Sequence, residues 1–324
     1  MERGTGRGIM QASISQIKDM AEWAGLLKQS AYSWHGHSME YQEIIQMNDQ
    51  RHDRWFNFLI VVEGEKYLFA GELFNNCLYS QEKYYAGLIP LDSFEHIETA
   101  ILVVKDIAKK LNAERVVLSY LETDKVLELI LPKLAFKASI SPQWQSASVM
   151  QVNDYEMIWD HVYPSKTRNM IRRSWKSLEF REINILDHVG DAVDCTWSKP
   201  ERHGSVMPVY YRDERAYKDR QERIAEILGE QAVSFGAFHK GKLIAYINTI
   251  RSHNEAIISN LLSNVNYYQH APNNGLFDFM IKHYCKDAEI KQLMYSFDGV
   301  ASVDKFKHSM GFKPLRVIRC VFEL

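Results

Sequence analysis

The last part of the chain contains, in order, residues 256–262 (AIISNLL), 267–275 (YYQHAPNNG), 292–297 (QLMYSF) and 315–322 (LRVIRCVF). The first, third and fourth segments are apolar runs of strand length, and the second is polar. A helix is predicted after the polar segment, because apolar residues recur there at helical spacing: Leu276, Phe277, Met280, Ile281 and Tyr284. A shorter helix is predicted over residues 300–310. This order of elements predicts an α/β (α+β) domain with a ligand-sized opening at one strand end.

Two short motifs complete this stretch. Asp298-Gly299 follows the strand at 292–297, and residues 306–312 have the sequence FKHSMGF. With these motifs the chain resembles the Fem-type branch of the GNAT acyltransferase superfamily. Members of that branch carry a Pro-Ser/Thr/Asn loop before the helix, an Asp-Gly pair after the next strand and a Phe-Lys-x-x-x-Gly-Phe segment near the end. The resemblance implies a tandem GNAT fold and the transfer of an acyl group.

The N-terminal half repeats this order of elements. The strand predicted at 115–120 and the Ala-Phe-Lys segment at 135–137 match 292–297 and the Gly-Phe-Lys segment at 311–313, each with an offset of roughly 176 residues. Equal spacing predicts two copies of one fold, as in Fem-type proteins, each copy a mixed, mostly antiparallel sheet flanked by helices. Two unrelated α/β units with the same rhythm of helices and strands are the alternative.

The boundary between the copies is predicted near Gln151, with a GNAT-like domain at 1–150 and another at 151–324. The first copy has Leu121-Glu122 where the second has Asp298-Gly299, and no segment like 269–275 precedes its helix. We therefore expect the N-terminal domain to be a degenerate scaffold or docking domain. The C-terminal domain is expected to be catalytic.

Further elements are predicted from periodicity and turn residues. In the first half they are a helix at 13–30, a hairpin with strands at 56–62 and 66–73, and helices at 94–111 and 123–134. In the second half they are an exposed helix at 213–226 and strands at 146–152, 233–238 and 243–250. Three antiparallel strands that lead into a helix are how the core of a GNAT domain begins.

The most basic segment of the chain is 164–181 (PSKTRNMIRRSWKSLEFR). On a helix, Arg168, Arg172 and Lys176 would share one face, and Ile171, Trp175 and Leu178 the other. We assign Arg168, Arg172, Arg173 and Lys176 as candidate anion or substrate ligands, for a phosphorylated or nucleic-acid group. A solvated helix face explains the same pattern equally well.

The donor site is predicted at the start of the helix that follows the polar segment. Asn273, Asn274 and Gly275 stand where free backbone N–H groups favour an anion. Gln269, His270 and Phe306 complete the predicted cofactor-binding set. The glycine pattern of ordinary acetyl-CoA enzymes is not matched, so both acyl-CoA and aminoacyl-tRNA remain candidate donors. Capping of the helix is the alternative role of the asparagine pair.

The predicted catalytic residues are Asp298, Lys307 and Tyr295. Asp298 at a strand end can orient an amine or help to remove its proton, and a turn residue is the alternative. The resemblance implies that Lys307 places a cation beside the developing oxyanion. Lys305 would point about 200° away on a helix, so both lysines cannot face one site.

Composition limits the remaining possibilities. The chain has 324 residues, 46% of them hydrophobic, and a net charge of −2, so no global basic field attracts nucleic acid. The four cysteines are scattered singly, which favours neither a disulfide framework nor a metal site. We expect no membrane span, no signal peptide and a cytoplasmic location.

The sequence thus predicts an N-acyltransferase that moves an acyl or aminoacyl group by direct transfer to an amine. No metal is expected, because no metal-binding motif is present. The acceptor is a small molecule, a peptide or a cell-wall precursor, and tRNA is a candidate partner. The alternative is a catalytically inactive GNAT-fold binding module that holds an anionic partner with the basic helix at 165–181.

Overall fold

A computed structural model describes residues 11–31, 33, 35–48, 55–80, 87–122, 128–129, 139–152, 154–202, 205–297 and 300–324. The chain divides into two compact units. Unit 1 comprises Met1–Trp144 together with Arg316–Leu324, and unit 2 comprises Gln145–Leu315. Among the described residues, no helix is both long and apolar enough to cross a bilayer.

Unit 1 is built on one mixed sheet. Its strands lie in the order β1-β2-β3-β4-β6-β15, and β5 pairs with β3. β4 and β6 are parallel, and the other neighbouring pairs are antiparallel. The bounds are β1 Ala12–Gln16, β2 Trp55–Val62, β3 Glu65–Phe74, β4 Cys77–Tyr79, β5 Ile89–Pro90, β6 Arg115–Leu121 and β15 Lys313–Glu323. The hairpin predicted around residues 63–65 is confirmed as β2 and β3.

Unit 1 includes the helices α1 Met20–Leu27, α2 Met39–Asn48 and α3 Ile97–Lys110, and a short 3-10 turn covers His35–His37. The helix predicted over 13–30 is wrong in its first part, because residues 12–16 pair with β2 as β1. The helix begins only after Asp19, whose side chain accepts a hydrogen bond from the Glu22 N–H. The helix predicted at 123–134 lies largely outside the described residues.

Unit 2 has a sheet of the same design. Its strands lie in the order β8-β11-β12-β13-β14-β7, where β13 and β14 are parallel and the other pairs antiparallel. The bounds are β7 Ser139–Gln151, β8 Glu179–Ile183, β11 Ala232–His239, β12 Lys242–Ser252, β13 Glu255–Ser263 and β14 Gln292–Phe297. β9 Glu201–Arg202 and β10 Ser205–Val206 form a separate small hairpin.

The main strand orders of the two units correspond. In each, three antiparallel pairings lead to one parallel pair, β4 with β6 in unit 1 and β13 with β14 in unit 2, and an antiparallel strand follows. The strands predicted at 115–120 and 292–297 occupy equivalent places, as two copies of one fold require. The last strand of unit 1 comes from the chain's C-terminus, so residues 316–324 lie with unit 1, whereas the sequence prediction placed them in the second domain.

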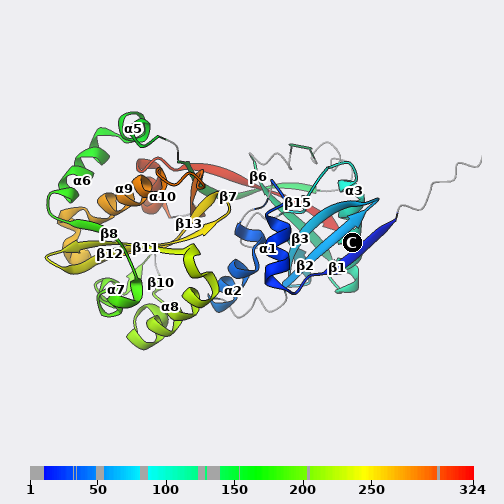
Figure 1. The fold of residues 1–324 in the computed structure, drawn as a ribbon, viewed down its shortest axis with the longest axis horizontal. Helices are drawn as coiled ribbons and strands as arrows, with labels where there is room; N and C mark the ends of the chain where they lie inside the picture. Colours follow the sequence, from blue (N-terminus) through cyan, green and yellow to red (C-terminus); the bar gives the residue numbers. More distant parts are fainter. Residues whose placement is uncertain are drawn as a thin grey trace, which may run out of the picture. The chain divides into compact units, whose positions relative to one another are not determined.

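Helices cover both faces of the unit 2 sheet (Figure 1). α9 Pro272–Tyr284 packs on one face beside α6 Ser165–Trp175 and α10 Ala301–Ser309, while α7 Val189–Trp197 and α8 Glu214–Leu228 pack on the other. The shorter helical turns are α5 Tyr155–Met157, a π-helical turn Ile158–Val162, and 3-10 turns Ile185–His188, Val209–Tyr211, Gly229–Gln231 and Val265–His270. The apolar stripe predicted for α9 is confirmed, because Leu276, Phe277, Met280, Ile281 and Tyr284 are all buried.

The basic helix is shorter than the sequence suggested. α6 ends at Trp175, and residues 179–183 form edge strand β8, where the Arg181 guanidinium stacks 4.0 Å from the centre of the Phe238 ring. Trp175 was expected on the buried face with Ile171. Its side chain is instead 44% exposed, whereas Ile171 is buried.

Candidate functional site

The parallel strands β13 and β14 of unit 2 separate toward their C-terminal ends. Their pairing covers Glu255–Ile257 and Gln292–Met294, although β13 continues to Ser263 and β14 to Phe297. The register of pairing also shifts once between β13 and its other neighbour, β12, and once between β14 and its other neighbour, β7. One lies where β13 pairs with Asn248 and Thr249 of β12, and one lies between Met294 and Phe297 of β14. Such bulges bend a strand and end regular pairing, which opens the sheet here.

A pocket of about 540 Å³ lies at this opening, and we call it the splay pocket. Its lining comes from the ends of both strands, from the starts of α9 and α10, and from the segment after α7. The lining residues are Lys199, Arg202, Leu261, Ser263, Tyr268, Asn273, Tyr295, Val300, Ser302, Val303 and Phe306. It therefore brings together three residues that the sequence predicted separately: Tyr295, Asn273 and Phe306.

Tyr295 is held in the wall of this pocket by other rings. Its ring centre lies 5.5 Å from that of Phe277 and 6.1 Å from that of Phe312. Burial raises the pKa of the Tyr295 phenol to about 12, because the phenolate would lose its hydration. At neutral pH Tyr295 therefore carries its proton, which is the protonation state that a general acid requires.

Lys307 is a buried cation beside Tyr295. Its side chain is 1% exposed, and Nζ lies 3.8 Å from Asp304 Oδ1 and 4.9 Å from the centre of the Tyr295 ring. A buried ammonium needs such partners, because its desolvation is costly. Lys307 meets the splay pocket through Tyr295 and is not among its lining residues. Lys305 is exposed, in agreement with the helical geometry that separates the two lysines.

Two cations of the splay pocket, Lys199 and Arg202, were missed by the sequence reasoning. The Arg202 Nη2 donates to the Cys195 carbonyl at 2.8 Å and to the Ser263 carbonyl at 3.1 Å, which ties the end of β13 to the segment after α7. The buried Arg202 Nε has no hydrogen-bond partner among the residues that the structure describes. No motif marks these residues, since only the fold brings them near β13.

The start of α9 has fewer free backbone N–H groups for an anion than the sequence predicted. Pro272 has no N–H, and the N–H groups of Asn274 and Gly275 donate to the Ala271 carbonyl at 3.1 and 3.4 Å. Asn273 lines the pocket, and its buried Oδ1 has no partner within the described part of the chain. Asn274 Nδ2 lies 3.8 Å from the sulfur of Met310.

Gly275 has a structural explanation. A Cβ at this position would lie within 2.5 Å of Phe180 Cζ and closer still to Ser174 Oγ. Its small size therefore lets α9 pack closely against α6.

Two further predicted donor-site residues, Gln269 and His270, are not among the residues that line the splay pocket, and the predicted catalytic Asp298 lies outside the described residues. Gln269 is exposed. His270 Nδ1 is hydrogen-bonded to Ser177 Oγ at 3.0 Å, and its ring lies 4.7 Å from that of His239. Gly299 is likewise outside the described residues.

The basic residues of α6 do not share one task. Arg168 Nη1 donates to the carbonyls of Trp159 and Asp160 at 3.1 Å each, so it supports the π-helical turn. Arg173 is exposed, and its Nη2 lies 3.1 Å from the sulfur of Met170. Arg172 and Lys176 line a second pocket.

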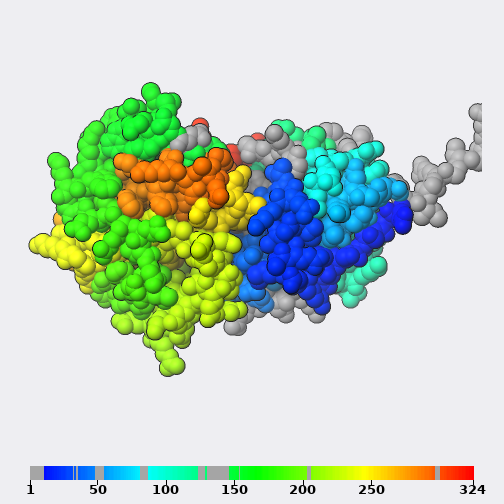
Figure 2. Space-filling model, viewed as in Figure 1, coloured from blue at the N-terminus to red at the C-terminus, as the bar shows by residue number. Residues whose placement is uncertain are grey.

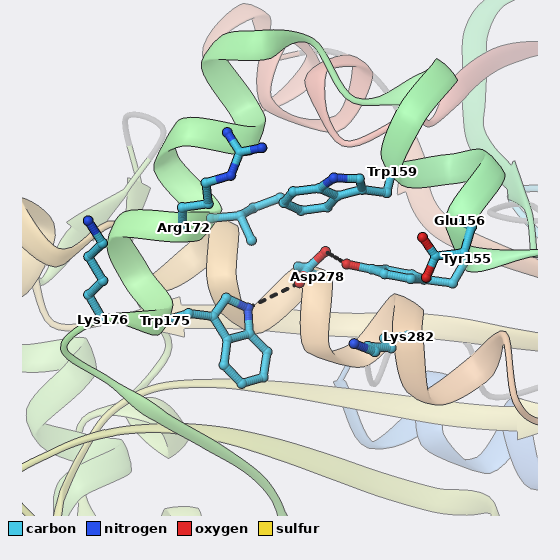
Figure 3. A pocket seen from close by; sticks show the side chains of 9 residues that line it. Tyr155, Glu156, Trp159, Arg172, Trp175, Lys176, Asp278 and Lys282 are labelled. Atoms are coloured by element: carbon cyan, nitrogen blue, oxygen red, sulfur yellow. Dashed lines mark hydrogen bonds between the residues drawn. The ribbon is translucent and has the colours of Figure 1, made fainter.

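This second pocket, the α6–α9 pocket, also has a volume of about 540 Å³ (Figure 3). It is lined by Tyr155, Glu156, Trp159, Ile171, Arg172, Trp175, Lys176, Asp278 and Lys282. The Asp278 carboxylate at its centre accepts hydrogen bonds from the Tyr155 hydroxyl at 2.7 Å and the Trp175 Nε1 at 3.1 Å. Burial raises the pKa of Asp278, and these two bonds oppose the shift.

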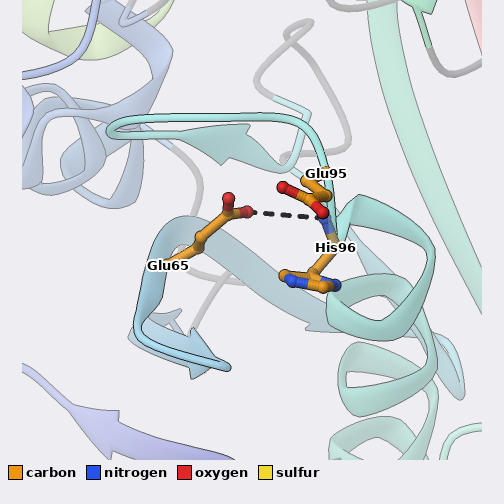
Figure 4. Close-up of side chains that lie close together, drawn as sticks. All are labelled: Glu65, Glu95 and His96. Carbon is orange, nitrogen blue, oxygen red and sulfur yellow. Dashed lines mark hydrogen bonds between the residues drawn. The ribbon is translucent and has the colours of Figure 1, made fainter.

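In unit 1, Glu65, Glu95 and His96 place three potential metal ligands within 4.8 Å of one another (Figure 4). Glu65 is already engaged, because it accepts hydrogen bonds from Ser93, Tyr67 and the His96 N–H. The bond from the His96 N–H to Glu65 caps the start of α3, because the side chain of the N-cap residue, His96, makes no capping hydrogen bond. Helix capping therefore accounts for the position of Glu65.

No family model and no curated protein matches the chain. Among solved structures, FemX has a TM-score of 0.70 at 11% identity, over 96% of this chain and 97% of that one. A tandem GNAT protein from the clavulanic acid biosynthesis pathway has a TM-score of 0.53 at 13% identity, over 97% of this chain and 98% of the other.

The chain has a tandem GNAT fold of the Fem type. The fold and the resemblance predicted from the sequence are thereby confirmed. A third similar structure, L-PGS from Bacillus licheniformis, has a TM-score of 0.57 at 10% identity and covers 94% of this chain and 92% of that one. At such identities the likeness establishes the fold alone.

Proposed function

We propose that the protein is an N-acyltransferase that joins an acyl or aminoacyl group to an amine in the splay pocket. The observation that carries this proposal is the separation of β13 and β14, which places Tyr295, Asn273 and Phe306 around one opening. Similar structures include FemX, a tandem GNAT protein and a GNAT-family acetyltransferase, which supports the reaction class.

The reaction runs by direct transfer. The amine nitrogen attacks the donor carbonyl carbon, a C–N bond forms, and the electron pair of the carbonyl moves to its oxygen. When this tetrahedral species collapses, the C–S bond of a thioester or the C–O bond of an aminoacyl ester breaks. The attacking nitrogen must lose a proton and the leaving sulfur or oxygen must gain one.

Tyr295 is the general acid in this scheme. Its raised pKa of about 12 keeps the phenol protonated at neutral pH, and it lines the splay pocket. Asp298 lies three residues after Tyr295 in the sequence. On the basis of the Asp-Gly motif, we assign it to receive the amine proton. Lys307 supplies positive charge beside Tyr295, where it would stabilise negative charge on the carbonyl oxygen.

The donor is acyl-CoA or aminoacyl-tRNA, and the start of α9 favours the second. An ordinary phosphate cradle needs several free N–H groups at a helix start. Here Pro272 removes one, and the N–H groups of Asn274 and Gly275 are used within the helix. The Lys199 and Arg202 side chains in the splay pocket suit an amine acceptor that also carries a carboxylate or phosphate, such as a peptide or a cell-wall precursor.

A binding module without catalysis is the second candidate. It is favoured by the exposed cations Arg172 and Lys176, which lie at the α6–α9 pocket and away from the splay pocket. In this case the fold would hold an anionic partner on α6.

Isothermal titration calorimetry with acyl-CoA and with charged tRNA, each at several salt concentrations, tests donor binding. We expect charged tRNA to bind with an affinity that falls steeply with salt, and Asn273→Leu, at the splay pocket, to weaken donor binding. Donor binding with no transfer to any amine in a mixed pool would favour the binding module. Absence of binding by both donors would overturn the proposal.

A further inference from the structure

The α6–α9 pocket combines aromatic rings with cations at the protein surface. Tyr155, Trp159 and Trp175 surround Asp278, while Arg172, Lys176 and Lys282 stand around them (Figure 3). In the space-filling view, the green surface that includes α6 adjoins the orange surface that includes α9 (Figure 2). The Trp175 side chain is 44% exposed, which is unusual for the largest apolar side chain.

A buried charge fixes these rings. Asp278 is 2% exposed, and its two oxygens accept the Tyr155 hydroxyl and the Trp175 indole N–H. Burial of a carboxylate in the middle of a helix is costly and does nothing for packing. Its evident effect is to hold Trp175 and Tyr155 in one orientation while the Trp175 ring remains open to solvent.

The backbone is also unusual at this place. Trp159 lies in the π-helical turn Ile158–Val162, where the Tyr163 N–H donates to the Ile158 carbonyl at 3.0 Å. π-helical turns are rare and occur frequently at functional sites. Arg168 holds this turn through the carbonyls of Trp159 and Asp160. Two independent features, the turn and the buried carboxylate, thus position the aromatic walls.

The cations complete a pattern of charge. The Arg172 guanidinium lies 5.3 Å from the Trp159 ring centre, and Lys282 Nζ lies 4.9 Å from that of Tyr155. Lys176 lines the same pocket one helical turn beyond Arg172. Glu156 is also exposed at this pocket and carries the opposite charge. The three cations outnumber it, so the rim carries net positive charge. Aromatic stacking surfaces interleaved with cations are the arrangement that binds single-stranded nucleic acid, since each base offers a flat face and each phosphate a charge.

We propose that the α6–α9 pocket binds single-stranded nucleic acid, with a base stacked on the open face of Trp175 and the adjoining phosphates at Arg172 and Lys176. Trp159 and Tyr155 form the remaining walls. Asp278 acts as a positioning residue, because it orients both Trp175 and Tyr155. The proposal depends on the geometry of this pocket alone, so it stands or falls separately from the transfer reaction.

Fluorescence anisotropy of a labelled single-stranded oligoadenylate, measured across a salt series, tests it. We expect Trp175→Ala to weaken binding roughly ten- to a hundredfold, because one stacked base is lost, and Trp175→Phe to retain part of it. Trp197→Ala is the matched control, since Trp197 is 51% exposed on α7 and belongs to neither pocket, and it should leave the affinity unchanged.

The charges are tested by the slope of affinity against salt. Arg172→Gln and Lys176→Gln should each reduce that slope by about one, whereas Lys305→Gln on α10 should not change it. Unchanged affinity in a folded Trp175→Ala and a folded Trp175→Phe protein would overturn the proposal. So would free AMP binding as tightly as the oligomer, which would indicate a site for single nucleotides. Binding of a neutral oligosaccharide that depends on Trp175 and is insensitive to salt would likewise contradict it.

Discussion

The Lys307 ammonium lies 4.9 Å from the centre of the Tyr295 ring and is 1% exposed. A cation in this position is buried behind the residue that donates a proton in the proposed reaction. The pair connects α10 to β14, the strand that forms one side of the splay pocket. Lys307 and Tyr295 are the two residues whose roles most need to be tested.

Lys307→Ala should lower kcat by roughly 10²- to 10³-fold, because it removes an interaction made mainly in the transition state. Donor affinity should change little. Steady-state kinetics with saturating donor measure the effect, and Lys305→Ala should have far less. Since Lys307 is buried beside Asp304, thermal unfolding must show that the variant is folded. Equal, small effects of the two substitutions would show that Lys307 has no catalytic role.

Tyr295→Phe should lower kcat by roughly 10²- to 10⁴-fold with little change in donor affinity or melting temperature. The substitution keeps the ring that packs on Phe277 and Phe312 and removes the hydroxyl. Because the Tyr295 pKa is about 12, wild-type kcat should show no alkaline loss from this group below about that pH. A fully active Tyr295→Phe enzyme would exclude Tyr295 as the acid.

Gly275→Ala should reduce the free energy of unfolding by about 1–3 kcal/mol, because the new methyl group overlaps Ser174 and Phe180. The double variant Ser174→Gly, Gly275→Ala should recover part of the loss. Gly25→Ala in α1 is the control, because nothing lies within 4 Å of its added Cβ, and it should stabilise by up to about 1 kcal/mol. Denaturant titrations measure all three, and a neutral Gly275→Ala would contradict the packing role.

Asp278 should make stability depend on pH. Its folded pKa is raised by burial, so the folded state binds this proton at a pH where the unfolded chain has lost it. The free energy of unfolding of wild type, relative to Asp278→Asn, should therefore rise as the pH is lowered from 7 toward 4. The contribution is lost again as the pH rises through the folded pKa. A difference that is constant with pH, or that falls on acidification, would contradict the raised pKa.

Most strands and helices followed from local pattern. The hairpin of β2 and β3, α9 with its buried stripe, and the strand pair β11 and β12 all have apolar periodicity that matches their packing. The periodicity prediction was wrong at residues 13–30. A strand followed by a helix has, in this segment, the same spacing of apolar residues as one continuous helix. Residues 12–16 form a strand because they pair with β2, which is distant in the sequence. Such a pairing cannot be predicted from the residues of the segment itself.

The site was predicted in part. Tyr295, Asn273 and Phe306 meet at the splay pocket because the end of β14, the start of α9 and one side of α10 converge there. Lys199 and Arg202 could not be found, since neither belongs to a motif. The α6–α9 pocket was hidden for another reason: Asp278 looks like a surface residue of α9 in the sequence, and only its bonds to Tyr155 and Trp175 reveal its burial.

Mass spectrometry of the acceptor tests the central claim most directly. The protein would be incubated with isotopically labelled aminoacyl-tRNA, and separately with labelled acyl-CoA, in the presence of a pool of amines. We predict that one amine gains the mass of the donor's acyl group through an amide bond, and that Tyr295→Phe abolishes most of this product. Donor that binds at the splay pocket without any amide product, for either donor and across the amine pool, would contradict the account.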